Sequence, residues 1–545
     1  MSWAIGAIGL LLFTLGLHNQ AFVGFESRFA LFAKEMLRHG PSVFPTTYGE
    51  PYPDYPATAT LLIYWLAIPF GDVGRLAAAI PTALASALNL ALSYRLLAVL
   101  SRRWALLTVC FELLTFTFLA EARALSLDQM VTTVTLACFL LVYSVDREQR
   151  FEKLKWLPLL LLIGFALRGP LGLVIPAGVV CSYYALSAQW PRLLRTGLLA
   201  ALVLAVAWAG LLALAALEGG RGFVAEVVRM QVSGRLESKT DLDRWYYFIS
   251  GFSNYALAWP AAFAVLLLAA RRFRERHRDP ALAMVFFLAG WVLLVVVGLS
   301  IPHTKKARYL LPVVPALSAI ATYPFIAHGD RALAALRRLL HGILVMLPGI
   351  ALAALWFGAQ MAQKKGFDLH LPLHSILIAL FVCQLGSLVL QFRREALGYR
   401  ELGAAGFAVL ALWLGYIALL EPALRQIHDT RSFVSSVEQL RGRALAPLAF
   451  YTMGKDADAI KYLVNVDYDL APAFYQRAAD LSRAPARLYI VAPASRDREL
   501  SAAGAGAPIF SGRFDNKLYS VFYLNRSATA TAPPAENTRQ ALNAP

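Results

Sequence analysis

Charged residues that could carry chemistry stand at the ends of apolar runs, with a few carboxylates among many arginine and lysine side chains. Arginine binds phosphate through paired hydrogen bonds, and a phosphate at the level of a membrane belongs to a lipid. A neighbouring carboxylate can act as a general base on an acceptor hydroxyl, or can orient it. The candidates are Glu26, Arg28, Glu50, Asp54, Glu121, Arg123, Asp128, Arg168, Arg235, Arg244, His303, Lys305, Lys306 and Arg308, with Tyr246, Tyr247 and Tyr309 beside them.

Several of these candidates also have a purely structural interpretation. Glu26 and Asp128 could each stabilise the start of a helix through the helix dipole. Arg168 could be an interface residue whose long side chain carries its charge to the membrane surface. The paired tyrosines are more typical of an interfacial belt. Lys305, Lys306 and Arg308, in contrast, run against the usual excess of positive charge on the inner side, which favours a function there. Lys306 and His303 are given no specific role.

The composition indicates a membrane protein. Of 545 residues, 58% are hydrophobic and only 16% are charged, which is too few polar residues to cover a soluble chain of this length. The formal net charge of +17 does not indicate a nucleic-acid partner, because most basic residues lie in short gaps between apolar runs. The four cysteines fall inside apolar runs without the spacing of a metal site or a disulfide pair.

Thirteen apolar runs are predicted to span the membrane as helices. They cover residues 3–18, 76–98, 104–120, 127–145, 155–168, 170–187, 195–217, 251–270, 282–300, 309–327, 336–358, 372–391 and 401–420. Every second connection is short and basic, for example Arg102-Arg103 and Arg393-Arg394. Such connections face the cytoplasm, so the N-terminus is predicted to lie inside and the C-terminal tail outside.

The connections on the other side are longer and carry most of the candidate residues. Residues 19–75 and 218–250 form two outer loops. Within the first loop, Glu26–His39 is amphipathic and ends before Gly40, and Ala57–Gly71 is aromatic but too short to span. Both segments are predicted to lie in the membrane interface.

The C-terminal part reads as a small α/β domain. The sequence predicts domains at 1–420 for the membrane part, 421–526 for this periplasmic domain and 527–545 for a disordered tail. Residues 432–440 and 457–463 are predicted as helices, and 448–453 and 487–492 as strands. Two further strands, 509–513 and 518–524, flank a short turn and predict a terminal hairpin.

The order of the motifs resembles a known family. Five segments carry the likeness: Phe25-Glu-Ser-Arg-Phe29, Gly49-Glu-Pro-Tyr-Pro-Asp-Tyr-Pro56, Ala122-Arg123 through Asp128, Arg168-Gly-Pro170, and Lys305 through Pro312. Together they resemble the GT-C glycosyltransferases, in the bacterial branch of the protein O-mannosyltransferase superfamily that includes lipid A aminoarabinose transferases. The resemblance implies about 13 transmembrane helices, outer juxtamembrane helices and a small outer α/β domain.

The resemblance also assigns roles. Glu26 and Asp128 become the catalytic candidates. The donor phosphate would be bound by Arg28, Arg168, Arg235, Lys305, Arg308 and Tyr309; the substrate pocket would include Tyr55, Arg123 and Tyr247; and Asp54 would hold a divalent metal. The implied reaction moves a sugar, such as 4-amino-4-deoxy-L-arabinose, from a polyprenyl-phosphate donor to lipid A or another envelope acceptor. A monomer in the bacterial inner membrane is expected.

Three positions depart from the family pattern. Its leading acidic residue is Phe25 here, the lysine expected after Asp54 is Tyr55, and the lysine of its Lys-Gly-Pro element is Arg168. Phenylalanine cannot accept a proton, so either Glu26 takes over that role or the reaction needs no base. A phosphate acceptor is already ionised near neutral pH and fits the second alternative.

Three alternatives stay open at this stage. A polysaccharide or protein could be the acceptor, and an inactive binding paralogue would also explain Phe25. A transporter or flippase of a lipid-linked glycan would be expected to show repeated halves and polar residues at mid-membrane depth. The apolar runs are almost free of charge at their centres, which favours transfer at the surface.

Overall fold

The computed structural model describes residues 1–18, 20–54, 56–233, 245–303, 305–364, 372–393, 397–442 and 447–525. The chain divides into two compact units. The first comprises Met1–Gln20 and Phe29–Leu424, and the second comprises Ala21–Arg28 and Arg425–Pro545. The predicted tail at 527–545 lies outside the described residues.

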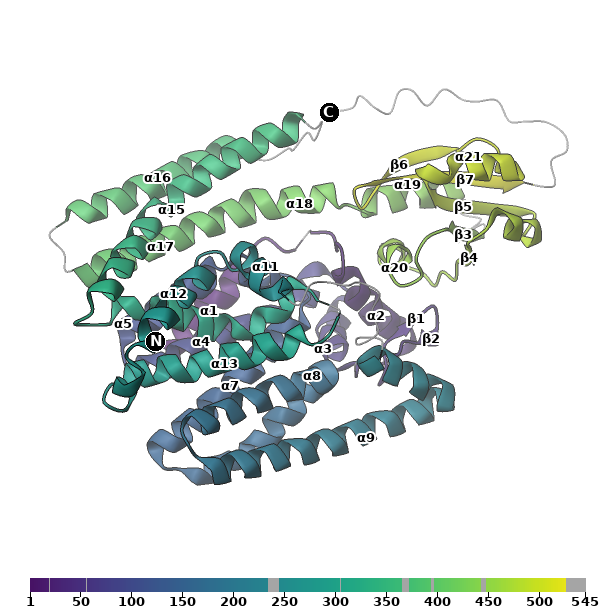
Figure 1. Ribbon diagram of the computed structural model, residues 1–545. Helices are drawn as coiled ribbons and strands as arrows, with labels where there is room; N and C mark the ends of the chain where they lie inside the picture. The colour runs from purple at the N-terminus through teal and green to yellow at the C-terminus, as the bar shows by residue number, and fades with distance from the viewer. Residues whose placement is uncertain are drawn as a thin grey trace. The chain divides into compact units, whose positions relative to one another are not determined.

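The first unit is helical (Figure 1). Its helices are α1 (Ser2–Thr14), α2 (Glu26–His39, whose first three residues belong to the second unit), α3 (Thr58–Ala67), α4 (Arg75–Ala98), α5 (Arg102–Leu114), α6 (Phe116–Ala122), α7 (Leu127–Glu148), α8 (Leu157–Leu186), α9 (Trp190–Val228), α11 (Tyr246–Asn254), α12 (Ala258–Ala270), α13 (Pro280–Ser300), α14 (Val314–Thr322), α15 (Arg331–Lys364), α16 (Leu373–Phe392), α17 (Leu397–Gly415) and α18 (Glu421–Ile427, whose last three residues belong to the second unit). The amphipathic segment at 26–39 is α2, as predicted.

Helices long and apolar enough to cross a membrane number eight in the described part of the chain, or ten if each of two bent pairs counts as one span. The predicted count of thirteen is therefore not confirmed. The difference lies in α1, which has only 13 residues, in α14, which has only 9, and in α8, which covers two predicted spans. A polytopic helical membrane protein is the architecture that these helices support.

One predicted span is broken. The run at 104–120 forms α5 and α6, which meet at a bend of 75° at Thr115. The backbone of Thr115 is extended, and its hydroxyl donates to the carbonyl of Phe111 at 2.9 Å. A hydrogen bond from a threonine hydroxyl to the preceding turn bends helices. Because position 115 is neither glycine nor proline, the bend was not predicted from the sequence.

Helix α8 folds back on itself at Arg168-Gly169. Both residues have non-helical backbone angles, and Gly169 has φ +59° and ψ −149°, a conformation open essentially to glycine alone. The two halves then approach so closely that a Cβ on Gly164 would lie 2.1 Å from the carbonyl oxygen of Gly172. The turn falls between the predicted spans at 155–168 and 170–187, and Arg168 lies at its tip.

Replacing Gly164 by alanine is expected to destabilise the protein, because the added methyl would overlap the Gly172 carbonyl and force the halves of α8 apart. Overpacking of this kind costs about 1–3 kcal/mol. Thermal unfolding of the purified protein measures the effect. Gly210→Ala in α9 is the matched control, because nothing lies within 4 Å of the methyl it would add. Equal melting temperatures for the two variants would contradict the tight hairpin.

The second unit contains a five-stranded sheet, drawn in yellow-green in Figure 1. The strands are β3 (Leu448–Tyr451), β4 (Ala473–Tyr475), β5 (Arg487–Pro493), β6 (Phe510–Phe514) and β7 (Lys517–Asn525), in the order β4-β3-β5-β7-β6. Strand β3 runs parallel to β4 and β5, and β7 pairs antiparallel with β5 and β6. Helices α19 (Arg431–Arg441), α20 (Asp458–Leu463) and α21 (Asp497–Leu500) accompany the sheet. Within this sheet, β4 alone has no counterpart among the predicted strands. The first unit also contains a short antiparallel pair, β1 (Thr46–Thr47) and β2 (Glu50–Pro51), which was not predicted.

The turn between β6 and β7 has a two-residue loop. Asp515 and Asn516 both have positive φ, +48° and +61°, and Phe514 pairs with Lys517 across the turn. These are the residue types that a type I′ turn favours. The Asp515 carboxylate accepts hydrogen bonds from Lys461 Nζ at 2.5 Å and from His428 Nδ1 at 2.9 Å. Burial would raise the pKa of Asp515, but these two bonds outweigh it and lower the pKa.

The lowered pKa of Asp515 makes the second unit sensitive to acid. A lowered carboxyl pKa contributes stability above the unfolded-state value, about 3.8 to 3.9, and this contribution is lost as the pH falls through the folded-state pKa. Protection of β6 and β7 against hydrogen exchange should therefore fall below about pH 4. Asp515→Asn keeps a residue that tolerates the left-handed backbone and should flatten this dependence. An unchanged pH profile in the variant would contradict the assignment.

Candidate active site

A buried cluster in the first unit brings together three predicted site residues. Asp128 forms ion pairs with Arg168 and Arg308; the Arg308 Nε lies 3.4 Å from Asp128 Oδ2, and Arg168 Nη1 contacts Oδ1. The side chains of Asp128 and Arg168 are each only 7% exposed, whereas that of Arg308 is 19% exposed. Arg308 is therefore the most accessible member of the cluster. The first and last of the three residues, Asp128 and Arg308, are 180 positions apart in sequence.

Local structure explains how each member is held. Asp128 lies in the first turn of α7, where the helix dipole favours a negative charge. Arg168 lies at the tip of the α8 hairpin, and its guanidinium carbon lies 4.9 Å from the centre of the Tyr309 ring. Arg308 and Tyr309 belong to η5 (Ala307–Val313), a single 3₁₀ segment that leads into α14.

Two buried tyrosines flank the cluster. Tyr255 donates a hydrogen bond from its hydroxyl to the Ala307 carbonyl at 2.8 Å, which fixes the start of η5. Tyr247, on α11, is fully buried and near enough to Tyr309 and Arg168 to interact electrostatically with them. The substrate-pocket role predicted for Tyr247 remains a prediction. Tyr255 was not predicted, because an aromatic residue at the start of an apolar run carries no distinguishing signal.

The cluster brings two guanidinium groups to one carboxylate. Lys305, three residues before Arg308 in the chain, is also buried. Asp128 itself is engaged with two guanidinium groups, and this geometry fits a residue that orients cations. The cluster is chemically suited to a ligand with a phosphate group.

Arg123 occupies a different position from the one predicted. It is fully buried, and its guanidinium donates to Glu421 Oε2 from Nε at 2.9 Å and from Nη2 at 2.7 Å. Its Nη1 donates to the carbonyls of Leu12 and Phe13. These bonds join α1, α18 and the end of α6. We therefore revise its predicted role from substrate contact to structural clamp, because no part of its side chain is exposed.

Glu26 and Arg28 belong to the second unit. Glu26 is 3% exposed and its carboxylate lies 3.3 Å from Arg425 Nη1. Arg425 also donates to the Ala21 carbonyl at 2.7 Å, so Glu26 has a charged partner that the sequence did not reveal. Arg28 donates to the Asp456 carbonyl at 3.0 Å. The roles predicted for these two residues remain predictions.

The remaining predicted residues fall on or near segments outside the described part of the chain. Tyr55 and Arg235 lie outside the described residues. Asp54 is buried in the first unit. Divalent metals such as Mg²⁺ and Ca²⁺ are bound by several oxygen ligands, and among the described residues no set of three acidic, histidine or cysteine side chains converges on Asp54. The described residues do not fit a metal there.

The fold has known counterparts among solved structures. The crystal structure of ArnT from Cupriavidus metallidurans bound to undecaprenyl phosphate superposes with a TM-score of 0.71, covering 98% of this chain and 99% of that one at 18% sequence identity. The apo structure of the same protein gives a TM-score of 0.70 over 97% of this chain at 17% identity. The chain has the ArnT fold.

Curated proteins with similar sequences are named as aminoarabinose transferases. A protein of Pseudomonas paraeruginosa named undecaprenyl phosphate-alpha-4-amino-4-deoxy-L-arabinose arabinosyl transferase is 28% identical over 370 residues, and one of the same name from Serratia proteamaculans is 27% identical over 342 residues. The first match spans 64% of this chain and 64% of the relative, and the second spans 60% and 58%. No protein-family model matches the chain. The predicted likeness to ArnT is confirmed in fold and in sequence.

Proposed function

We propose that this protein is a glycosyltransferase that moves a sugar from a polyprenyl-phosphate donor to an acceptor such as lipid A. The observation that carries the proposal is the buried Asp128 carboxylate between two arginine side chains, one of them at the tip of the α8 hairpin. An ArnT with the same fold was solved with undecaprenyl phosphate bound. The 4-amino-4-deoxy-L-arabinose named for the curated relatives is the proposed sugar.

In the proposed reaction an oxygen of the acceptor forms a new bond to C1 of the sugar while the bond from C1 to the donor phosphate oxygen breaks. The polyprenyl phosphate leaves with the electron pair, and negative charge grows on its phosphate. We assign the stabilisation of that charge to Arg308 and Arg168, which both pair with Asp128, because prepositioned cations act most strongly where charge develops. Lys305 and Tyr309 are proposed as further contacts of the donor. The donor-binding roles of Arg28 and Arg235 remain predictions from the sequence.

The acceptor decides whether a base is needed. A lipid A phosphate is already ionised and has no proton to lose, which fits phenylalanine at position 25. A hydroxyl acceptor would have to give its proton to Glu26 or Asp128, each of which is paired with arginine. We therefore favour a phosphate acceptor, with Asp128 as a positioning residue. No step of the proposed reaction uses a metal.

The proposed setting is the bacterial inner membrane, with the N-terminus in the cytoplasm and the second unit in the periplasm as a monomer. The basic connections between apolar runs support this orientation.

Transfer in proteoliposomes tests the proposal. Purified protein receives a polyprenyl-phosphate donor with a radiolabelled aminoarabinose and either intact lipid A or lipid A stripped of its phosphates. Label on intact lipid A alone supports both the activity and the phosphate acceptor. Label on the stripped lipid as well supports the transferase but overturns the phosphate acceptor. Donor that crosses the bilayer without transfer, or binds without turnover, overturns the transferase.

A further inference from the structure

A sharply bent pair of helices packs against the segment that carries Arg308. Helices α11 and α12 meet at a bend of 117°, and α11 contacts η5. Tyr255 lies in this bend, directly after the last residue of α11, and is fully buried. Its hydroxyl donates the 2.8 Å hydrogen bond to the carbonyl oxygen of Ala307, the first residue of η5. Arg308 of the Asp128 cluster is the next residue in the chain.

The backbone on both sides of Tyr255 is fixed. Its N–H donates to the carbonyl of Gly251 at 3.0 Å, and its own carbonyl accepts from the N–H of Trp259 at 2.9 Å. The two helices approach so closely that a Cβ on Gly251 would lie 2.5 Å from the Trp259 ring. The hydroxyl of Thr117 in α6 donates to the carbonyl of Asn254 at 2.9 Å, which ties the bend to a further helix. The Tyr255 side chain therefore starts from a well-restrained backbone.

The carbonyl that Tyr255 contacts belongs to the same peptide unit as the backbone nitrogen of Arg308. The six atoms of a peptide unit are coplanar, so the direction of the Ala307 carbonyl fixes the direction in which the Arg308 Cα lies. A carbonyl oxygen has two lone pairs, so it can accept the hydroxyl in addition to a hydrogen bond within η5. A small rotation of this plane moves the end of a long arginine side chain further than it moves the backbone. The hydrogen bond to the Ala307 carbonyl therefore restrains Arg308 as well.

The ion pair between Arg308 and Asp128 is a longer contact. Arg308 Nε lies 3.4 Å from Asp128 Oδ2, whereas a charge-assisted hydrogen bond of this type is about 2.7–2.9 Å long. The side chain of Arg308 is also 19% exposed, compared with 7% for Arg168. Because this contact is long and partly open to solvent, the backbone of η5 has a large share in deciding where the Arg308 guanidinium lies.

We propose that Tyr255 is a positioning residue that holds Arg308 where negative charge develops on the leaving phosphate. The inference rests on the proposed function, in which Arg308 stabilises that charge. Tyr255 acts through the Ala307 carbonyl and does not contact the substrate. A displacement of about 1 Å can cost about 100-fold in rate. Because the charge develops only in the transition state, the loss should appear in kcat and not in KM.

The experiment measures initial rates of sugar transfer by the full chain in proteoliposomes, at varied concentrations of the polyprenyl-phosphate aminoarabinose donor. Tyr255→Phe keeps the buried ring and removes only the hydroxyl. We expect kcat to fall by about 10- to 100-fold and the KM for the donor to change by less than about twofold.

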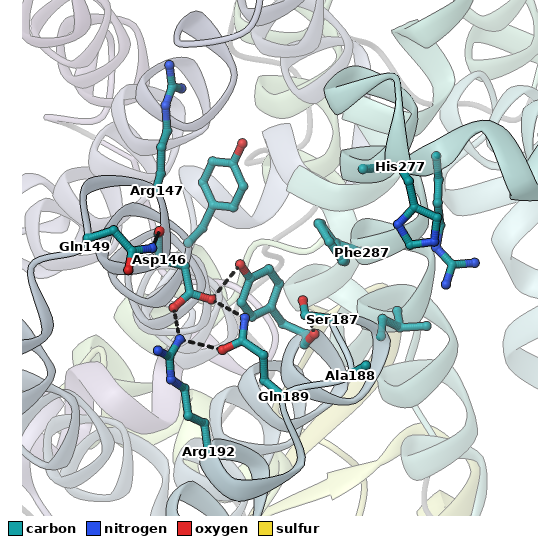
Figure 2. A pocket seen from close by; sticks show the side chains of 14 residues that line it. Asp146, Arg147, Gln149, Ser187, Ala188, Gln189, Arg192, His277 and Phe287 are labelled. Carbon is teal, nitrogen blue, oxygen red and sulfur yellow. Dashed lines mark hydrogen bonds and ion pairs between the residues drawn. The ribbon is translucent and has the colours of Figure 1, made fainter.

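The matched control is Tyr183→Phe, which also removes one hydroxyl from a buried tyrosine. Tyr183 donates to Asp146 Oδ2 at 3.0 Å, and Asp146 lies 18 residues from Asp128, at the opposite end of α7. Asp146 keeps two other donors, Arg192 Nη1 at 2.6 Å and Gln189 Nε2 at 2.7 Å (Figure 2). The kcat of this control should stay within about twofold of the wild type, because the site is remote from Arg308. Melting temperatures check that both variants are folded.

A double-mutant cycle with Arg308→Ala separates positioning from a general effect on the fold. If the hydroxyl acts through Arg308, adding Tyr255→Phe to Arg308→Ala should lower the residual rate by less than about twofold, because both changes remove the same contribution. The inference alone is overturned if Tyr255→Phe lowers the rate by the same factor in both backgrounds, or if its kcat stays within about twofold of the wild type. A wild type that transfers no sugar would overturn the proposed function, and the inference with it.

Discussion

Replacing Arg308 by alanine is expected to reduce sugar transfer at least about 100-fold, the effect of removing one preorganised donor from a site of developing charge. The protein should stay folded, because Arg308 is the most exposed member of the Asp128 cluster and Arg168 still neutralises the carboxylate. Arg308→Lys keeps the charge but loses the paired hydrogen bonds, so partial activity is expected. Initial rates of label transfer in proteoliposomes measure all three proteins.

The control for this variant is Lys306→Ala, an exposed cation two residues away for which we propose no role. If Lys306→Ala and Arg308→Ala lower the transfer rate by similar factors, the loss reflects general surface charge and not a specific contact of Arg308. Asp128→Asn separates positioning from base catalysis, because asparagine still accepts hydrogen bonds from the arginines but takes no proton. Retained transfer in Asp128→Asn with loss in Asp128→Ala would support positioning; loss in both would support a base.

Replacing Glu421 by alanine is expected to destabilise the protein by about 3–5 kcal/mol, because it leaves the Arg123 charge buried without its carboxylate. Arg123 is fully buried and the side chain of Glu421 is only 4% exposed. Arg123→Ala should cost a comparable amount. Thermal unfolding of the purified protein, read at constant detergent concentration, measures both variants.

The matched control for the buried pair is an exposed one. Glu148 and Lys153 approach to 2.7 Å with side chains 44% and 36% exposed, and Glu148→Ala should leave the melting temperature nearly unchanged, because water screens an exposed pair. The double variant Arg123→Met with Glu421→Leu should recover much of the loss, because no charge then remains buried. If the Glu421→Ala and Glu148→Ala proteins melt alike, Arg123 is not a clamp.

Elements with a local signal were predictable from sequence. The amphipathic pattern predicted α2 at its observed bounds, and the Gly-Pro pair after Arg168 predicted a tight connection. The residues Asp515-Asn516 between two alternating runs predicted the β6–β7 turn, since their side chains tolerate positive φ. In each case the cause acts within a few residues, where the sequence displays it directly.

Partners distant in sequence were not predictable. Arg123 meets Glu421 across 298 positions, and Glu26 meets Arg425 across 399. A single sequence lists the charges that need a partner but does not say which ones meet. The same limit explains why Arg123 was predicted to contact substrate: a charged residue at the end of an apolar run looks the same whether a ligand or another side chain neutralises it.

Helix α7 is tied to its neighbours at both ends, by Asp128 to Arg168 and Arg308 and by Asp146 to Arg192. Eighteen residues of α-helix span about 27 Å, close to the roughly 30 Å hydrocarbon thickness of a bilayer. The helix therefore cannot shift along its axis to adjust to a thicker or thinner membrane without breaking an ion pair. In a bilayer of different thickness, either the helix bundle must tilt or the surrounding lipid must deform. The fixed length of α7 thus determines the bilayer thickness that fits the protein best.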